Sequence, residues 1–184
     1  MQRNITHYTT PHHRETIMTR TTYDFGNGEV PAHRHVNPDH SLGGWVADTA
    51  TVSLTAWVQN RARVFDNARV SDNAEVFGNA WVHGNAQVSD DARVYNDARV
   101  SGNAWVYGDA QVYGNAKVFD NAEVFDNAEV YDNAKVFGNA QVTDNAQVYG
   151  NAEVCGHTWV YGNAEVSDDA RVYGEARVGD NDYR

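Results

Sequence analysis

Residues 110–139 read AQVYGN AKVFDN AEVFDN AEVYDN AKVFGN, which is five copies of one six-residue unit. The unit extends far beyond this stretch, because every sixth position from Val46 to Val178 is valine, giving 23 valines without a gap. Two residues before these valines, from position 50 to position 176, 21 of 22 residues are alanine and the exception is Thr158. Such a regular period indicates a repeat architecture rather than an ordinary globular domain.

Each unit predicts a short strand followed by a corner. Alanine and valine two residues apart lie on the same side of an extended segment, so they point inward while their neighbours point outward. The next two positions are mostly Gly or Asp and then Asn, which tolerate positive φ or hydrogen-bond to nearby backbone. Three strands and three corners would close a triangular coil of 18 residues. We therefore predict an all-β parallel solenoid of nearly eight coils over residues 45–178, with a narrow interior suited to small and β-branched side chains.

The two ends of the chain lack this period. Residues 1–44 hold six of the eight histidines, and we expect them to form an N-terminal cap or oligomerisation segment. A cap is needed because the unpaired strand edges at the end of a solenoid would otherwise recruit other chains. Residues 179–184 form a short charged C-terminal end.

The repeat resembles that of the hexapeptide-repeat proteins, which fold as single-stranded left-handed parallel β-helices. The likeness rests on an aliphatic residue, a Gly/Asp-Asn corner and an Ala two positions before the next aliphatic residue, as in residues 134–139. The left-handed winding is implied by this resemblance. Proteins of the superfamily are commonly trimers, so the resemblance also implies a homo-oligomer, with a trimer favoured. The segment Gly43-Gly44-Trp45-Val46 is similar to uncharacterised repeat proteins of bacteria and their phages, a likeness that brings no established activity.

Composition excludes several classes of function. The 184 residues carry 14 Lys+Arg and 25 Asp+Glu, a formal net charge of −11, which argues against direct binding of nucleic acid or of an anionic membrane. A single cysteine rules out an intrachain disulfide framework and a zinc site built on cysteines. No apolar run approaches the length of a membrane span, and the N-terminus lacks the apolar core of a signal peptide, so we expect a cytoplasmic protein. We expect no cofactor.

Aromatic residues occupy outward positions at an 18-residue spacing, so they should form ladders along the solenoid. Such ladders have three interpretations: stacking within the chain, a surface for self-association, or a surface on which a sugar or base stacks. The candidate binding and interface residues are Phe77, Tyr95, Tyr113, Tyr131 and Tyr149 on one face, and Trp105, Tyr107, Trp159 and Tyr161 on a second.

Histidines supply weaker candidates for chemistry. His157 replaces the corner Asn in the one disturbed unit and is the best candidate for a catalytic general base, although a simple corner substitution is favoured. His33 and His35, with His40 nearby, could present imidazoles to a metal, but no third ligand is specified. The superfamily also includes γ-type carbonic anhydrases, whose zinc is held by three histidines between subunits. The spacing they need is absent here, because the coils contain only His83 and His157.

We therefore favour a non-enzymatic, homo-oligomeric solenoid that binds or sequesters a partner. If the protein is of phage origin, the partner could be a small nucleotide-like molecule or a masked host protein. The first alternative is a hexapeptide-repeat acyltransferase that uses His157. The second is an acidic mimic of DNA, which is weakened by five arginines that interrupt the negative surface, namely Arg61, Arg63, Arg69, Arg93 and Arg99.

Overall fold

The computed structural model describes residues 21–59 and 61–180, and this part of the chain contains 25 strands and no helix. Three strands are longer than two residues: β1 (Thr22–Asp24), β2 (Glu29–Val36) and β3 (Leu42–Ala47). Every later strand consists of a repeat valine and the residue before it. Within the described residues, no helix is long and apolar enough to cross a bilayer.

The strands form three sheets. Sheet I contains β1, β2, β3, β6 (Arg63–Val64), β9 (Trp81–Val82), β12 (Arg99–Val100), β15 (Lys117–Val118), β18 (Lys135–Val136), β21 (Glu153–Val154) and β24 (Arg171–Val172). Sheet II contains β4 (Thr51–Val52), β7 (Arg69–Val70), β10 (Gln87–Val88), β13 (Trp105–Val106), β16 (Glu123–Val124), β19 (Gln141–Val142), β22 (Trp159–Val160) and β25 (Arg177–Val178). Sheet III contains β5 (Trp57–Val58), β8 (Glu75–Val76), β11 (Arg93–Val94), β14 (Gln111–Val112), β17 (Glu129–Val130), β20 (Gln147–Val148) and β23 (Glu165–Val166).

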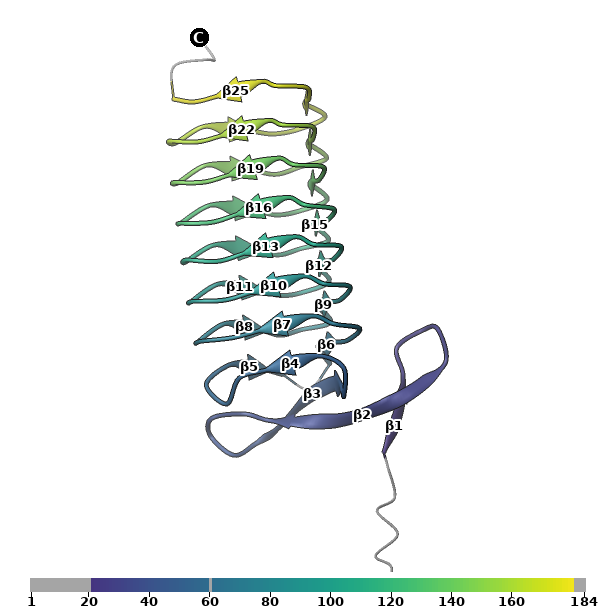
Figure 1. Ribbon diagram of the computed structural model, residues 1–184. Coiled ribbons are helices and arrows are strands. Elements are labelled where there is room, and N and C mark those ends of the chain that lie inside the picture. Colours follow the sequence, from purple (N-terminus) through teal and green to yellow (C-terminus); the bar gives the residue numbers. More distant parts are fainter. Residues whose placement is uncertain (1–20, 60, 181–184) are drawn as a thin grey trace, which may run out of the picture.

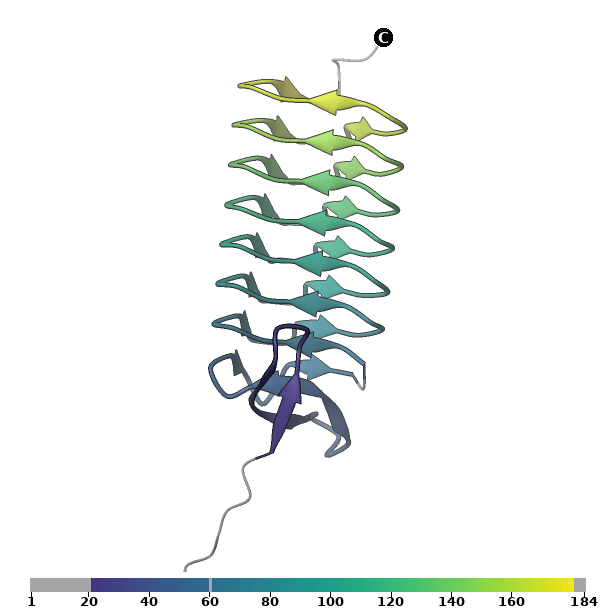
Figure 2. The ribbon, with the colours of Figure 1, turned by 90° about the vertical axis from the view of Figure 1, so that its right-hand side faces the viewer.

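Within each sheet the repeat strands are parallel and in register at a separation of 18 residues. Val88, for example, is paired with Val70 on one side and with Val106 on the other. The coils stack into the straight column that Figures 1 and 2 show from two sides. The prediction of an all-β parallel solenoid with 18 residues per coil is therefore confirmed.

The interior is a single column of alanine and valine. From Ala56 to Val160, every repeat valine and every alanine two residues before a repeat valine is fully buried or nearly so. The small alanine and the rigid β-branched valine suit the narrow prism. The inward-facing residues of each unit thus serve packing, and the outward-facing residues are available for other roles.

Each corner is held by two kinds of contact. From Asp66 to Gly174 the first corner residue is Gly, Asp or Asn in the left-handed region, for example Asp66 at φ 58° and Gly84 at φ 72°, which these residue types tolerate best. The Asp66 carboxylate accepts a hydrogen bond from the Gly84 backbone amide in the coil above, at 3.0 Å. The second corner residue, usually Asn, donates its side-chain amide to the corner residue of the next coil. One such ladder runs through Asn67, Asn85, Asn103, Asn121 and Asn139.

The N-terminal end of the column is covered by strand β2, which is paired antiparallel with β1 and with β3 (Figure 1). Two side chains at the end of β2 take the place of a missing coil. Asn37 Oδ1 accepts a hydrogen bond from the Val58 amide, and His35 Nε2 lies 3.0 Å from the Ala56 carbonyl oxygen. Both backbone groups belong to the first coil and are buried, so leaving them unpaired would be costly.

Candidate functional site

The predicted ladder of five aromatic residues is a continuous stack on the outward face of sheet III. Neighbouring rings have centroids 4.7–4.9 Å apart and planes within 3–5° of parallel. The tyrosine hydroxyls donate to Gln or Glu side chains of the next coil, as Tyr113 does to Glu129 Oε2 at 2.9 Å. Burial and this hydrogen bond raise the pKa of Tyr113. The rings are half-buried rather than exposed, because each covers the faces of its neighbours. Stacking within the chain therefore occurs, and the expected role in self-association stays a prediction.

The second predicted face, on sheet II, is not continuous. Trp105, Tyr107 and Phe125 form one cluster, with Tyr107 and Phe125 stacked at 4.9 Å. Trp159 and Tyr161 form another, with ring centroids 5.0 Å apart. The coil between the two clusters presents Gln141 and Thr143 instead of aromatic residues. Trp105 and Trp159 are 39% and 37% exposed, so they are the most accessible residues of the predicted set.

His157 continues a corner ladder. Its Nε2 atom lies 3.2 Å from Nδ2 of Asn139, and because an amide nitrogen only donates, the imidazole nitrogen accepts. His157 thus occupies the place that Asn takes in the coils below it. This position matches the corner substitution that the sequence favoured over a catalytic base.

The three candidate metal ligands of the N-terminal segment have separate surroundings. His33 Nδ1 lies 3.0 Å from the Asp48 carboxylate, whereas His35 is buried against the Ala56 carbonyl. Burial lowers the pKa of His35 below its usual value. His40 is exposed, in a turn where its φ is 66°. Among the residues described, no group of three His, Cys, Asp or Glu side chains is placed to hold a metal ion.

A site that the sequence reading missed lies where the β1–β2 hairpin packs on sheet I. Tyr23 of β1 stacks on Trp45 of β3, with ring centroids 4.6 Å apart and planes 20° from parallel. Phe25 at the end of the same hairpin stacks on Phe65 at 4.8 Å, and Phe65 in turn meets Trp81 edge-on at 5.9 Å. These aromatic contacts join the hairpin to the first three coils.

Arginines interleave with the aromatic rings of this cluster. The Arg63 guanidinium lies 5.5 Å from the Tyr23 ring centroid and 5.1 Å from that of Trp81. Arg99 lies over the other side of Trp81 at 4.6 Å. A surface groove of about 200 Å³ runs between these groups, and we call it the arginine–tryptophan groove. It is lined by Tyr23, Trp45, Arg61, Arg63, Asn79 and Trp81.

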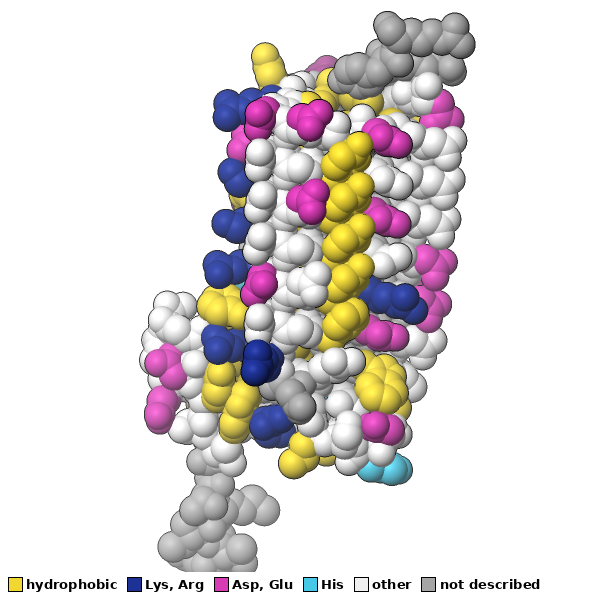
Figure 3. Space-filling view, turned by 180° about the vertical axis from the view of Figure 1, so that it is seen from behind, with side chains coloured by type: hydrophobic (Ala, Val, Ile, Leu, Met, Phe, Trp, Pro, Cys, Tyr) yellow, Lys and Arg dark blue, Asp and Glu magenta, His cyan; other side chains and the backbone are white. Residues whose placement is uncertain are grey.

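Strand register explains this arrangement. The outward residues that precede the valines of sheet I stand directly above one another, and we call them the outer row of sheet I. From the N-terminal end they are Trp45, Arg63, Trp81, Arg99, Lys117, Lys135, Glu153 and Arg171. Figure 3 shows the corresponding column of basic side chains along one edge of the molecule, beside a central column of hydrophobic side chains.

The cations of the outer row fall into two groups. Lys135 and Arg171 are both paired with Glu153, at 2.8 and 3.5 Å. Within the described part of the chain, no carboxylate forms an ion pair with the other cations of the row, Arg63, Arg99 and Lys117, or with Arg61 at the neighbouring corner. A guanidinium stacked on an aromatic ring still presents its N–H edge, which suits a phosphate or carboxylate. The lower end of the row is therefore a stack of rings and guanidinium planes that presents unneutralised N–H donors at its edge.

One column of acidic residues lies on the side of the solenoid away from the outer row. The corner between sheets II and III, which faces away from sheet I across the triangular section, carries Asp72, Asp90, Asp126 and Asp144 at its first position. This column is separated in space from the outer row, whereas Glu153 belongs to the row and Asp97 lies beside the groove, where it accepts a hydrogen bond from Asn79. An anion approaching sheet I meets positive charge even though the whole chain is acidic.

One family model matches the chain. Residues 68–84, 86–100, 92–108 and 98–114 match the YdcK beta-solenoid repeat. These coils are similar to that repeat. The matched segments include strands β7 to β14, so they cover Trp81 and Arg99 but not the N-terminal hairpin. The match supports a β-solenoid repeat protein and states no activity. No curated protein matches the chain.

Proposed function

We propose that this β-solenoid is a binding scaffold rather than an enzyme, and that the arginine–tryptophan groove holds a nucleotide-like anion. One observation carries the proposal. Arg61 and Arg63 line the groove with two tryptophans and a tyrosine, Arg99 stacks on Trp81, and none of these arginines has a carboxylate partner among the described residues. Stacking on aromatic rings and charge-assisted hydrogen bonds from arginine are the two contacts that a phosphorylated nucleoside needs.

The outer row lowers the stability of the fold, and this loss supports the same proposal. Arg99, Lys117 and Lys135 are register neighbours on successive strands. Like charges directly opposite one another on adjacent strands are destabilising, by roughly 0.2–1 kcal/mol per pair. A bound phosphate would relieve this repulsion. Residues that oppose stability without helping the fold are typical of functional sites.

Self-association belongs to this proposal. Copies of the chain would associate through the tyrosine stack of sheet III, which leaves the edges of five half-buried rings accessible along the column. A trimer is the state that the resemblance to hexapeptide-repeat proteins favours. The groove on sheet I would then stay on a different face from the subunit contact and remain available for sequestering a small ligand.

Calorimetric titration with adenosine 5′-monophosphate, adenosine and inorganic phosphate tests the binding proposal. We expect the nucleotide to bind more tightly than adenosine or phosphate, because only it uses both the rings and the guanidinium groups. A double variant, Arg61→Gln with Arg99→Gln, should weaken binding about fivefold or more. The matched control is Arg69→Gln with Arg93→Gln, which removes two exposed arginines from sheets II and III. Equal affinities for the two double variants would refute the groove as the site.

A further inference from the structure

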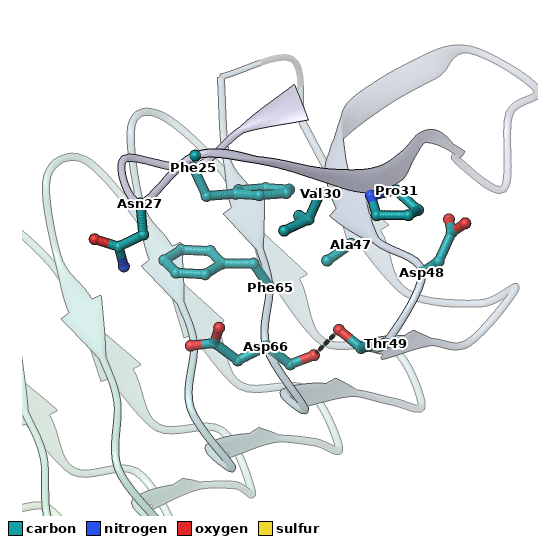
Figure 4. Close-up of a pocket in the computed structure, with 10 residues that line it drawn as sticks. Phe25, Asn27, Val30, Pro31, Ala47, Asp48, Thr49, Phe65 and Asp66 are labelled. Carbon is teal, nitrogen blue, oxygen red and sulfur yellow. Dashed lines mark hydrogen bonds between the residues drawn. The ribbon is translucent and has the colours of Figure 1, made fainter. Parts of the chain in front are cut away.

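A second cavity lies on the other side of the N-terminal hairpin, between the hairpin and the first coils. Its volume is about 340 Å³, at the lower end of the range for pockets that hold small molecules. Figure 4 shows the stacked rings of Phe25 and Phe65 on one side of it, with Val30, Pro31 and Ala47 opposite. Phe25, Phe65 and Ala47 are buried, while Val30 is 41% exposed. The other lining residues, including Pro31, Asp48 and Asp66, are exposed as well, so the cavity has an apolar floor and opens to solvent.

The hairpin that forms one wall is fixed by its own hydrogen bonds. Asp24 Oδ1 accepts hydrogen bonds from the amides of Gly26 and Gly28, at 2.7 and 3.0 Å. Both glycines have φ above 100°, a conformation that only glycine adopts without strain. The opposite side is fixed by the side chain of Thr49, which donates to the Asp66 carbonyl oxygen. The cavity is thus formed before any ligand enters, which lowers the entropic cost of binding.

The charged groups around this cavity have one sign. Asp48 and Asp66 lie at its two ends in Figure 4, and no lysine or arginine is among its lining residues, all of which the structure describes. The neighbours of the two carboxylates are His33, 3.0 Å from Asp48, and His83, 3.8 Å from Asp66. Burial lowers the pKa of His83 and outweighs the nearby Asp66 carboxylate, so this imidazole is neutral at pH 7.

We infer that this cavity binds a small organic cation, with an apolar body between the Phe65 ring and Val30 and an ammonium group at the Asp66 carboxylate. The Asp66 side chain is 53% exposed, so its attraction for an ammonium group is partly screened by solvent and the apolar lining supplies the rest of the binding. An anion such as a nucleotide is disfavoured here, so this site is independent of the arginine–tryptophan groove.

Nuclear magnetic resonance titration of the full-length protein tests the inference with three probes of nearly equal size. These are 2-phenylethylamine, the uncharged 2-phenylethanol and the anionic phenylacetate. The amine should shift the backbone amide resonances of Gly28, Ala47 and Thr49, which line the cavity. We expect it to bind about threefold more tightly than the alcohol, because an ion pair with a half-exposed carboxylate is partly screened. Equal binding of amine and alcohol, or binding of phenylacetate at these amides, would overturn the assignment of a cation.

Two variants with matched controls locate the site. Asp66→Asn should weaken amine binding severalfold, and Asn tolerates the positive φ of this corner. Its control is Asp90→Asn, because Asp90 has the same conformation and accepts a hydrogen bond from Gly108 at 3.0 Å, as Asp66 does from Gly84.

Val30→Trp should fill the cavity and abolish the amide shifts. Its control is Val36→Trp, at an exposed position of the same strand that does not line the cavity. Amine shifts that survive in Val30→Trp would show that the cavity is not the site.

Discussion

Reversing the charge of Lys117 should make the free protein more stable and should lower its affinity for a nucleotide. Lys117 stands between Arg99 and Lys135 in the outer row of sheet I. Adjacent strands are about 4.8 Å apart, and two unit charges at about 5 Å in water repel by about 0.8 kcal/mol, less when the side chains move apart. Taking about 0.3 kcal/mol for each pair, Lys117→Glu removes two repulsions and adds two attractions, a gain of about 1 kcal/mol in the free energy of unfolding.

Urea unfolding at two salt concentrations measures this effect. At about 0.01 M NaCl the Debye length is about 30 Å and the gain should be complete, whereas at about 1 M NaCl it is about 3 Å and most of the gain should vanish. The affinity for adenosine 5′-monophosphate should fall in the same variant, because the positive potential beside Arg99 is reduced. Gained stability together with lost binding would identify the row as a binding feature rather than a structural one.

Arg93→Glu is the control of opposite sign. Arg93 stands between Glu75 and Gln111 on sheet III, so reversing its charge replaces an attraction by a repulsion. This variant should lose about 0.5 kcal/mol at low salt. If Lys117→Glu is no more stable than the unmodified protein at low salt, or if its gain is independent of salt, the electrostatic reasoning about the outer row is wrong.

Two further predictions concern the tyrosine stack and the N-terminal end. Tyr113→Ser with Tyr131→Ser should convert an oligomer into a folded monomer in sedimentation velocity, and a protein that sediments as a monomer without these changes would rule out the stack as a subunit contact. His35 donates from a neutral imidazole to Ala56, and its pKa is lowered mainly by burial. The stability from this contact should therefore be present above about pH 6.5 and be lost as the pH falls through the lower pKa of the folded state. Hydrogen exchange should show the Val58 amide losing protection on acidification, and an equal loss in His35→Gln would contradict this assignment.

The interior and the corners could be predicted from the sequence because each position of the repeat has one physical role. The valines and alanines must fit the narrow prism, and Asp66 or Gly84 must adopt a positive φ. The ladder from Phe77 to Tyr149 was also predictable, since an 18-residue spacing fixes which residues are neighbours. Its degree of exposure was not, because that depends on side-chain rotamers that turn each ring face onto the next.

The arginine–tryptophan groove depends on a segment that has no period. Tyr23 reaches Trp45 only because β2 returns antiparallel along β3, and no repeat in residues 1–44 specifies that return. A signal was nevertheless present in the coils. Read at the 18-residue spacing, the residues before the valines of sheet I alternate as Trp45, Arg63, Trp81 and Arg99. Most aromatic side chains lie at the other outward position, after the valines, so this alternation is apparent only when the outer row is taken by itself.

Net charge is a poor guide to the partners of a solenoid, and the reason is geometric. Residues 18 apart share one row, so a few substitutions repeated at that spacing build a column of one charge type, while another column carries the opposite charge. Here the acidic corner that includes Asp90 and the basic row that includes Arg99 lie on different sides of one narrow rod. Because the Debye length at physiological salt is about 8 Å, a ligand at one face is largely screened from charges on the far side. The −11 charge therefore disfavours polyanions that would wrap the whole rod, and it does not disfavour a small anion held on sheet I.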